Sequence, residues 1–503
     1  MRQHSANSEQ RFSYPARALL LGLFVAQVIA AVQVYLSNLD LYRSLSTIKA
    51  AGYLTIPNQL TMPSLQELTS AFFGGLFFTL SVGVGLTLVS IGAAWVWHRV
   101  FSRNRYLLIF FLLFWAGSLV ELNHRGFSFG ATGYFFAIPP VVFLATLRWI
   151  PARPGNRGWF HGALHTIPVV VLALLWALQI GKNFFVDFRD ILLLSNPVGI
   201  KVNDFYYDYT LYPAEVFKSL DQKLLKTCTL QDLKKGPLNA RVEMELLSRD
   251  YLPVATDDAV DLEMVQNNGV LVFKHGGKTV IQTAVAEFLS DPATVLEEFS
   301  AKSDRHGFFR LFTFYSLLMG LPLALYLFLH ALIRLLCSFF LDVRISSLIA
   351  STFCLIVGLS ILVPFHYMRG TNMKLKDVPQ ALASECWQER LAALRIIERK
   401  KLEVSSFPPY PRLLKSPHVA ERYWLARALA VSHRPETYRD LLTFLDDPHP
   451  NVVSMAFYGL GQRGDRRGVS EILTRIQTSD HWYNQWYAYK ALRNLGWKQR
   501  KSN

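Results

Sequence analysis

The chain of 503 residues contains seven stretches of mostly apolar residues, each about as long as a membrane-spanning helix. A helix needs about 20 apolar residues to cross a hydrocarbon core, and it satisfies its own backbone hydrogen bonds there. Hydrophobic residues make up 51% of the chain, more than is usual for a soluble domain. We therefore predict a mainly α fold built on a polytopic bundle of about seven membrane helices. The predicted spans are residues 17–36, 72–97, 106–122, 134–150, 163–181, 311–333 and 345–366.

The distribution of Lys and Arg around these spans predicts their orientation. If the chain crosses at each span, one side of the membrane holds Arg2, Arg11, Arg17, Arg99, Arg103, Arg105, Arg148, Arg153, Arg157, Arg334 and Arg344, and the other side only Arg43, Lys49 and Arg125. This excess puts the N-terminus in the cytoplasm, with the first span as an uncleaved anchor. The segments after the fifth and seventh spans then face the opposite side, which is the periplasm if the chain belongs to a bacterial inner membrane. The absence of any Asn-x-Ser/Thr acceptor suits a bacterial envelope.

The sequence divides into four regions on this basis. Residues 1–181 form a membrane region with five helices, 182–308 a soluble insert, 309–367 a membrane hairpin of two helices, and 368–503 a repeat domain. Three short runs within the insert, 261–266, 269–274 and 279–283, have strand composition and are joined by glycine-containing turns. We expect a small α+β domain with a three-stranded meander. The aromatic tract from Phe205 to Tyr212 is expected to pack on the core of this domain, although a membrane interface or a partner could also hold it.

The membrane spans carry few polar groups with an evident function. Gly75, Thr79, Gly83 and Thr87 repeat every four residues in the second span, which predicts a seam where another helix approaches closely; a gate is the alternative. Glu121, His124 and Arg125 form a candidate polar cluster at the membrane edge. His161 and His165 share a helix face and could ligate haem iron, although histidines at a membrane edge are commonly interfacial.

We find no motif for a catalytic site, a metal or a cofactor. Gly277-Lys278-Thr279 lacks the first glycine of a phosphate loop, because Val272 stands at that position. The four cysteines include no CxxC pair, and we therefore expect neither a disulfide framework nor structural zinc. We therefore expect a protein that is not an enzyme and that has no cofactor.

The chain repeats itself between residues 384 and 497 with a period of about 31 residues. Ser416-Pro417-His418 returns as Asp447-Pro448-His449 and then as Ser479-Asp480-His481, and Leu429 returns as Leu460 and Leu492. Residues 384–397 fit as a degenerate first unit. Successive helical repeats are about 8 to 10 Å apart, which is too far for one metal ion to bind all three histidines, so we expect them to shape the turns.

These repeats resemble HEAT-like repeats of the phycobilisome-lyase type, in which a short turn precedes each pair of helices. The resemblance covers about a quarter of the chain and implies an α-solenoid that binds proteins. The last unit is rich in aromatic side chains, and these are candidates for a partner-binding face or, alternatively, for packing within a capping repeat. The candidates are Trp482, Tyr483, Trp486, Tyr487 and Tyr489.

The leading functional hypothesis is a membrane-anchored scaffold whose insert and repeats hold protein partners, for example during assembly of an envelope complex. A transporter or channel with regulatory soluble domains is the second hypothesis, and a haem protein or another membrane enzyme is the third. Nucleic acid is not expected as a partner, although the net charge is +15, because the basic residues gather at span ends and in the last third of the chain.

Overall fold

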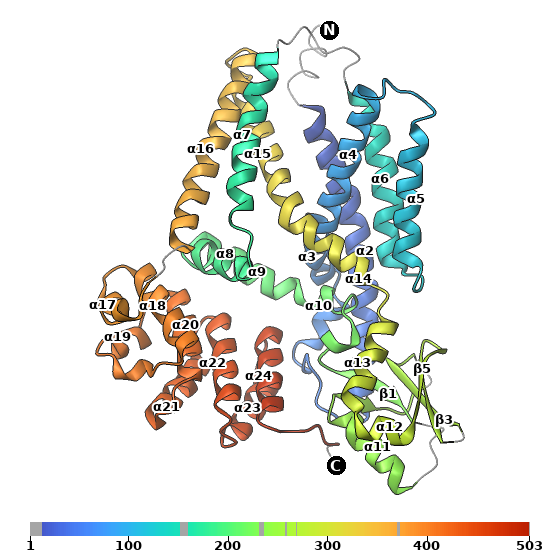
Figure 1. Cartoon of the computed structure of the whole chain (residues 1–503), viewed down its shortest axis with the longest axis vertical. Coiled ribbons are helices and arrows are strands. Elements are labelled where there is room, and N and C mark those ends of the chain that lie inside the picture. Colours follow the sequence, from blue (N-terminus) through green and yellow to red (C-terminus); the bar gives the residue numbers. More distant parts are fainter. Residues whose placement is uncertain are drawn as a thin grey trace. The chain divides into compact units, whose positions relative to one another are not determined.

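The computed structural model describes residues 13–150, 159–230, 236–256, 259–267, 269–369 and 373–501. The chain is mainly helical with one small sheet (Figure 1). It divides into two compact units, and each is assembled from segments that are distant in the sequence. Residues 1–36, 71–184 and 305–367 form the helical unit, and residues 37–70, 185–304 and 368–503 form the composite unit.

The helical unit contains the apolar helices. Five helical stretches of the described chain are long and apolar enough to cross a membrane: Tyr14–Ala50, Leu68–Arg99, Phe129–Trp149, Gly307–Cys337 and Val343–Arg369. They correspond to α2 (Tyr14–Ala50), α3 with α4 (Leu68–Phe78 and Val84–Arg99), α6 (Phe129–Trp149), α14 with α15 (Gly307–Tyr315 and Leu321–Cys337) and α16 (Val343–Arg369). Two further apolar helices are shorter, namely α5 (Leu108–Asn123) and the part of α7 (Trp159–Ala177) from Thr166 onward.

The glycine stripe of the second predicted span packs against α2, which confirms the predicted seam. A Cβ atom added to Gly83 would lie 2.5 Å from the Cβ of Ala26, and one added to Gly75 would lie 3.1 Å from the backbone of Ala30. Between these contacts the hydroxyl of Thr79 donates to Gln27 Oε1 at 2.7 Å. Glycine is therefore required where the two helices touch, because a side chain would push them apart.

Two π-helical turns interrupt long helices of this unit and contact each other. One covers Thr79–Gly83 between α3 and α4, and the other covers Ser316–Gly320 between α14 and α15. Such turns widen a helix locally, and they occur frequently at functional sites.

The composite unit contains a five-stranded sheet in the order β2-β1-β3-β4-β5. The predicted meander is present as β3 (Leu262–Asn267), β4 (Val270–His275) and β5 (Lys278–Ala284), which pair antiparallel. Sequence patterning missed β1 (Lys226–Thr229) and β2 (Tyr251–Pro253), which are too short to show alternation and pair parallel. The core of the sheet domain includes Cys228, Phe273 and Phe288. Phe288 lies on α12 (Val285–Ser290), which is followed by α13 (Pro292–Ser303).

The repeat region is built on four first helices that stack in sequence order: α18 (Trp387–Lys400), α20 (Val419–Ala430), α22 (Pro450–Arg463) and α24 (Trp482–Asn494). Second helices α19 (Tyr410–Leu414), α21 (Pro435–Thr443) and α23 (Gly468–Thr478) connect them, and α17 (Val378–Ala383) precedes the stack. Small residues such as Ala426, Ala456 and Ala488 are fully buried where the first helices touch. Ile56 and Leu194, from segments far away in the sequence, belong to the same core.

Candidate functional site at the turns of the repeats

The turns before the first helices are built alike in the four repeats. The side chain of Ser416 accepts a hydrogen bond from the backbone N–H of His418 at 3.1 Å, and Asp447 does the same for His449 at 2.9 Å. Ser384 and Ser479 make the equivalent bonds to the residues two positions further on. We call the surface formed by these turns and the adjoining ends of the first helices the turn face. These bonds use the backbone N–H, which Cys386 supplies in the first repeat, and the side chain of His449 adds a contact of its own, because its Nδ1 accepts from the backbone N–H of Asn451 at 3.3 Å.

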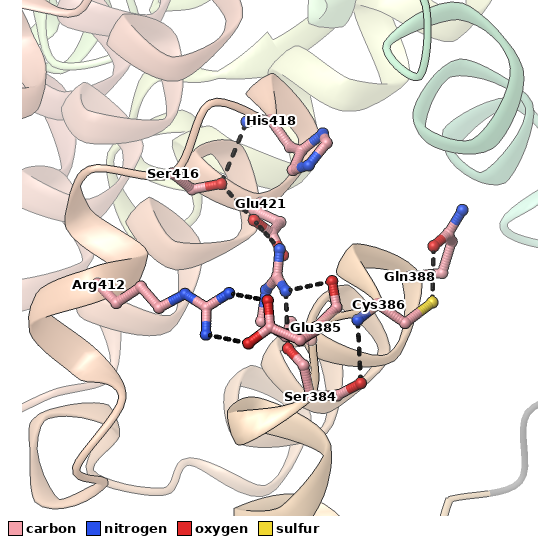
Figure 2. A network of polar contacts seen from close by, with 9 residues as sticks. Ser384, Glu385, Cys386, Gln388, Arg412, Ser416, His418 and Glu421 are labelled. Atoms are coloured by element: carbon pink, nitrogen blue, oxygen red, sulfur yellow. Dashed lines mark hydrogen bonds and ion pairs between the residues drawn. The ribbon is translucent and has the colours of Figure 1, made fainter.

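An arginine that is largely shielded from water links each of the first two repeats to the next. Figure 2 shows the surroundings of the first link, at Glu421. Arg390 Nε lies 2.6 Å from Glu421 Oε1, and its Nη1 donates to the backbone oxygen of Ser384 at 2.7 Å. One repeat later, Arg422 makes the same two kinds of contact, with Asp447 at 2.6 Å and with the backbone oxygen of Ser416 at 2.7 Å. These ion pairs are largely shielded from water and hold neighbouring repeats in register.

A segment of the insert supplies a second set of charges to the repeats. Asp190, fully buried in a π-helical turn (Arg189–Leu193) that follows α8 (Phe184–Phe188), lies 2.7 Å from Arg189 and 2.6 Å from Arg395 of α18. The indole nitrogen of Trp424 on α20 donates to the same carboxylate at 2.5 Å. Asp187 completes the cluster through Arg395 at 2.8 Å and Arg369 at 2.7 Å. Buried charges of this kind require all their partners, since an unpaired one is costly.

Helix α9 (Pro197–Tyr209) of the insert follows the turn face across the last two repeats (Figure 1). His449 Nε2 lies 3.3 Å from Asp204 Oδ1, and His481 Nε2 lies 3.5 Å from Asp208 Oδ1. The two aspartates are one helical turn apart, and the two histidines occupy equivalent positions of successive repeats. The carboxylates also lie at the N-terminal ends of α22 and α24, where the helix dipole favours negative charge.

Burial lowers the pKa of His449, whose side chain is only 9% exposed. The carboxylates of Asp204 and Asp447 oppose this shift, whereas Arg422 and His481 add to it. The neutral imidazole is therefore favoured in the folded chain.

The aromatic tract of the insert packs on the last repeat and not on the sheet core, so the expectation for this tract is wrong. Tyr207 lies against Tyr483 with ring centroids 4.3 Å apart, and Tyr212 stacks on Trp482 at 4.9 Å. The tract forms the last part of α9 and the start of α10 (Leu211–Glu215), and its sequence gave no indication that the repeats would lie beside these helices.

The five aromatic candidates of the last repeat all lie against other parts of the composite unit or against one another. Trp482 is 6% exposed, and Tyr489, with no exposure, donates to Asp250 of the sheet domain at 2.5 Å. The hydroxyls of Tyr483 and Tyr487 are 3.3 Å apart, and Trp486 carries Lys490 over its ring at 3.7 Å. These residues bind segments of the same chain in this structure.

The loop between the first two long apolar helices, α2 and α3, also contacts the last repeat. The backbone N–H of Asn58 donates to Gln485 Oε1 at 2.7 Å, and the Asn58 amide donates to the backbone oxygens of Ile476 and Ser479 at 2.7 and 2.8 Å. Asn58 and Gln485 are both buried. The last repeat thus contacts three other parts of the chain, which are the loop at Asn58, helix α9 and the sheet domain.

The remaining candidates from the sequence lie in the helical unit. Glu121, His124 and Arg125 are exposed neighbours: His124 Nδ1 is 3.9 Å from Glu121, and Arg125 Nε donates to His124 at 3.2 Å. The side chains of His161 and His165 lie outside the described residues. Within the described residues, no group of three or more His, Cys, Asp or Glu side chains could hold a metal ion.

Sequence reasoning missed Asp187, Asp190 and Asn58 as members of the site. The signal for the aspartates was their place in an apolar run, residues 184–194, because charged groups in such a run are buried only with partners. Asn58 carried no comparable signal.

Comparison with known proteins identifies one part of the chain. Residues 408–493 match the family model of HEAT repeats, which confirms the HEAT-like character of the C-terminal region. No curated protein and no solved structure matches the chain. The fold and the turn face thus define a helical chain with five candidate membrane spans, a small sheet and C-terminal HEAT repeats. HEAT repeats suggest interaction with proteins.

Proposed function

We propose that the chain is a multi-pass adaptor of a bacterial inner membrane, whose HEAT-like solenoid holds a partner protein next to the membrane. The observation that carries this proposal is that the last repeat already binds three separate segments of its own chain through buried polar and aromatic contacts. The contacts are those of a protein-binding surface. No catalytic role is part of the proposal.

The shared core of the composite unit supports placing its three segments on one side of the membrane. Residues 37–70, 185–304 and 368–503 pack together, so the chain must cross the membrane an even number of times between consecutive segments. The five long apolar stretches satisfy this condition, and so do seven spans if the two shorter apolar helices both cross. Together with the excess of Lys and Arg on the N-terminal side, this favours a periplasmic composite unit.

The turn face is occupied by the chain itself, which leaves the second helices for a partner. Arg439 on α21 and Thr474 on α23 are exposed on these helices. A photo-crosslinking amino acid placed at either position in the full-length chain in its native membrane should give a discrete heavier adduct. The same group at the exposed Lys302 of α13 is the control and should give none. Adducts at all three positions, or at none, would count against an adaptor that uses the repeats.

A transporter remains the second candidate because of the two contacting π-helical turns in the helical unit. A paired widening of this kind could allow the helices to change register, as gating requires. Flux of small ions or solutes through vesicles containing the purified chain would favour transport. Vesicles that stay as tight as empty ones would favour the adaptor.

A further inference from the structure

Helix α9 has two faces of opposite character. The face toward the repeats carries Asn203, which is 1% exposed, together with Asp204 and Asp208. The other face carries Val198 and Val202, which are 73% and 53% exposed, and Tyr206, which is 43% exposed. These three residues are four positions apart, so they form one apolar stripe along the helix.

Large exposed apolar side chains are confined to particular parts of the composite unit. Leu68, Phe185 and Leu375 are at least 45% exposed, and each lies within about eight residues of a long apolar helix or of α7. In contrast, none is found among the described residues of the repeats from Val378 onward. Apart from Met244, which is 61% exposed, and the stripe on α9, the exposed apolar side chains of the composite unit therefore lie close in sequence to the apolar helices.

A short linker ties the start of α8 to the end of the apolar helix α7. Helix α7 ends at Ala177 and α8 begins at Phe184, and the six residues between them span at most about 20 Å. Lys201 is exposed next to Val202 on α9, and Lys182 is exposed in the linker before α8, as in helices that lie among anionic headgroups.

We propose that α9 lies in the membrane interface with Val198, Val202 and Tyr206 in contact with lipid, and that its opposite face holds the repeats. The partner of this surface is therefore a bilayer containing anionic lipid. The helix then lies between the lipid and the turn face, and its contacts with the turns hold the repeats at the membrane surface. This inference rests on the membrane anchoring proposed above.

Spin labels can test the contact in the full-length chain reconstituted in vesicles of phosphatidylcholine and phosphatidylglycerol. Val202→Cys is labelled in a background whose four native cysteines are replaced, and accessibility to oxygen, which concentrates in lipid, is compared with accessibility to a water-soluble nickel chelate. Met244→Cys is the matched control, because Met244 is an apolar residue of the same unit and is 61% exposed on α11 (Pro237–Leu247). We expect the oxygen-to-nickel ratio at position 202 to exceed that at position 244 several-fold, and Val198→Cys to behave like Val202→Cys.

Three results would overturn the proposal. Equal ratios at positions 202 and 244 would place α9 in water, and protection of position 202 from both reagents would mean that a second copy of the chain covers it. A ratio at position 198 that matches water would exclude a continuous lipid-facing stripe. Release of the chain from the vesicles by alkaline carbonate would instead refute the membrane anchor itself, so the two failures are distinguishable.

Discussion

Replacement of Asp190 by alanine should destabilise the composite unit strongly. Its fully buried carboxylate is paired with Arg189 and Arg395 and accepts a hydrogen bond from Trp424. Removing one partner of a buried ion pair costs about 3 to 5 kcal/mol. We expect the lower end, about 3 kcal/mol, because Arg395 keeps Asp187 and Arg189 keeps its contact with the ring of Tyr423. For a unit of this size the loss corresponds to a decrease in Tm of roughly 6 to 12 °C.

The assay is thermal unfolding of the full-length chain in mild detergent, followed by a thiol-reactive dye. Ala428→Cys in a background without other cysteines reports on the repeat core, since Ala428 is fully buried, and Cys354 alone reports on the helical unit. Asp187→Ala is the matched control, with an expected loss of about 1.5 kcal/mol because its two arginine partners are about a fifth exposed. Equal shifts for the two aspartate variants, or an equal shift reported by Cys354, would refute the reasoning.

Three further predictions use matched variants and the same unfolding assay. Gly83→Ala should cost about 1 to 3 kcal/mol by forcing α2 and α4 apart, whereas Gly92→Ala, where a Cβ would meet nothing within 4 Å, should not destabilise the chain. Arg390→Ala should cost about 3 to 5 kcal/mol, whereas Arg412→Ala, which breaks an exposed pair in Figure 2, should leave the stability nearly unchanged; equal losses would contradict the role given to burial. The pKa of His449 is lower in the folded chain than its unfolded value of about 6.5. The composite unit should therefore keep its full stability above about pH 6.5 and lose stability as the pH falls below it, and His449→Gln should remove part of this pH dependence.

Periodicity was sufficient for those parts of the fold that each repeat one simple pattern. The apolar stretches, the helix seam at Gly83 and the repeats from Ser416 onward follow from a single helical or repeat period. The meander was predictable because its turns contain glycine, as at Gly269. The parallel strands β1 and β2 were not, since three or four residues show no period and their pairing depends on distant segments.

The candidate site was less predictable because it is made by contacts between distant segments. The turns at His449 and His481 could be aligned from the sequence, but the aspartates opposite them lie 245 and 273 residues earlier in the chain. Likewise, the aromatic side chains of the last repeat could be recognised as a contact surface, but their partners could not be identified. Local sequence determines the shape of a turn, whereas the choice of its neighbour depends on the whole fold.

Labelling from one side of the membrane tests most directly whether the loop, the insert and the repeats share a compartment. In intact spheroplasts of chains with one cysteine each, an impermeant maleimide should reach Cys386 in the repeats, Met244→Cys in the insert and Leu60→Cys in the loop, all of which are exposed. Arg105→Cys, in the exposed loop between α4 and α5, should react only after lysis. Labelling of any of the first three from the other side would contradict the common core and the adaptor built on it.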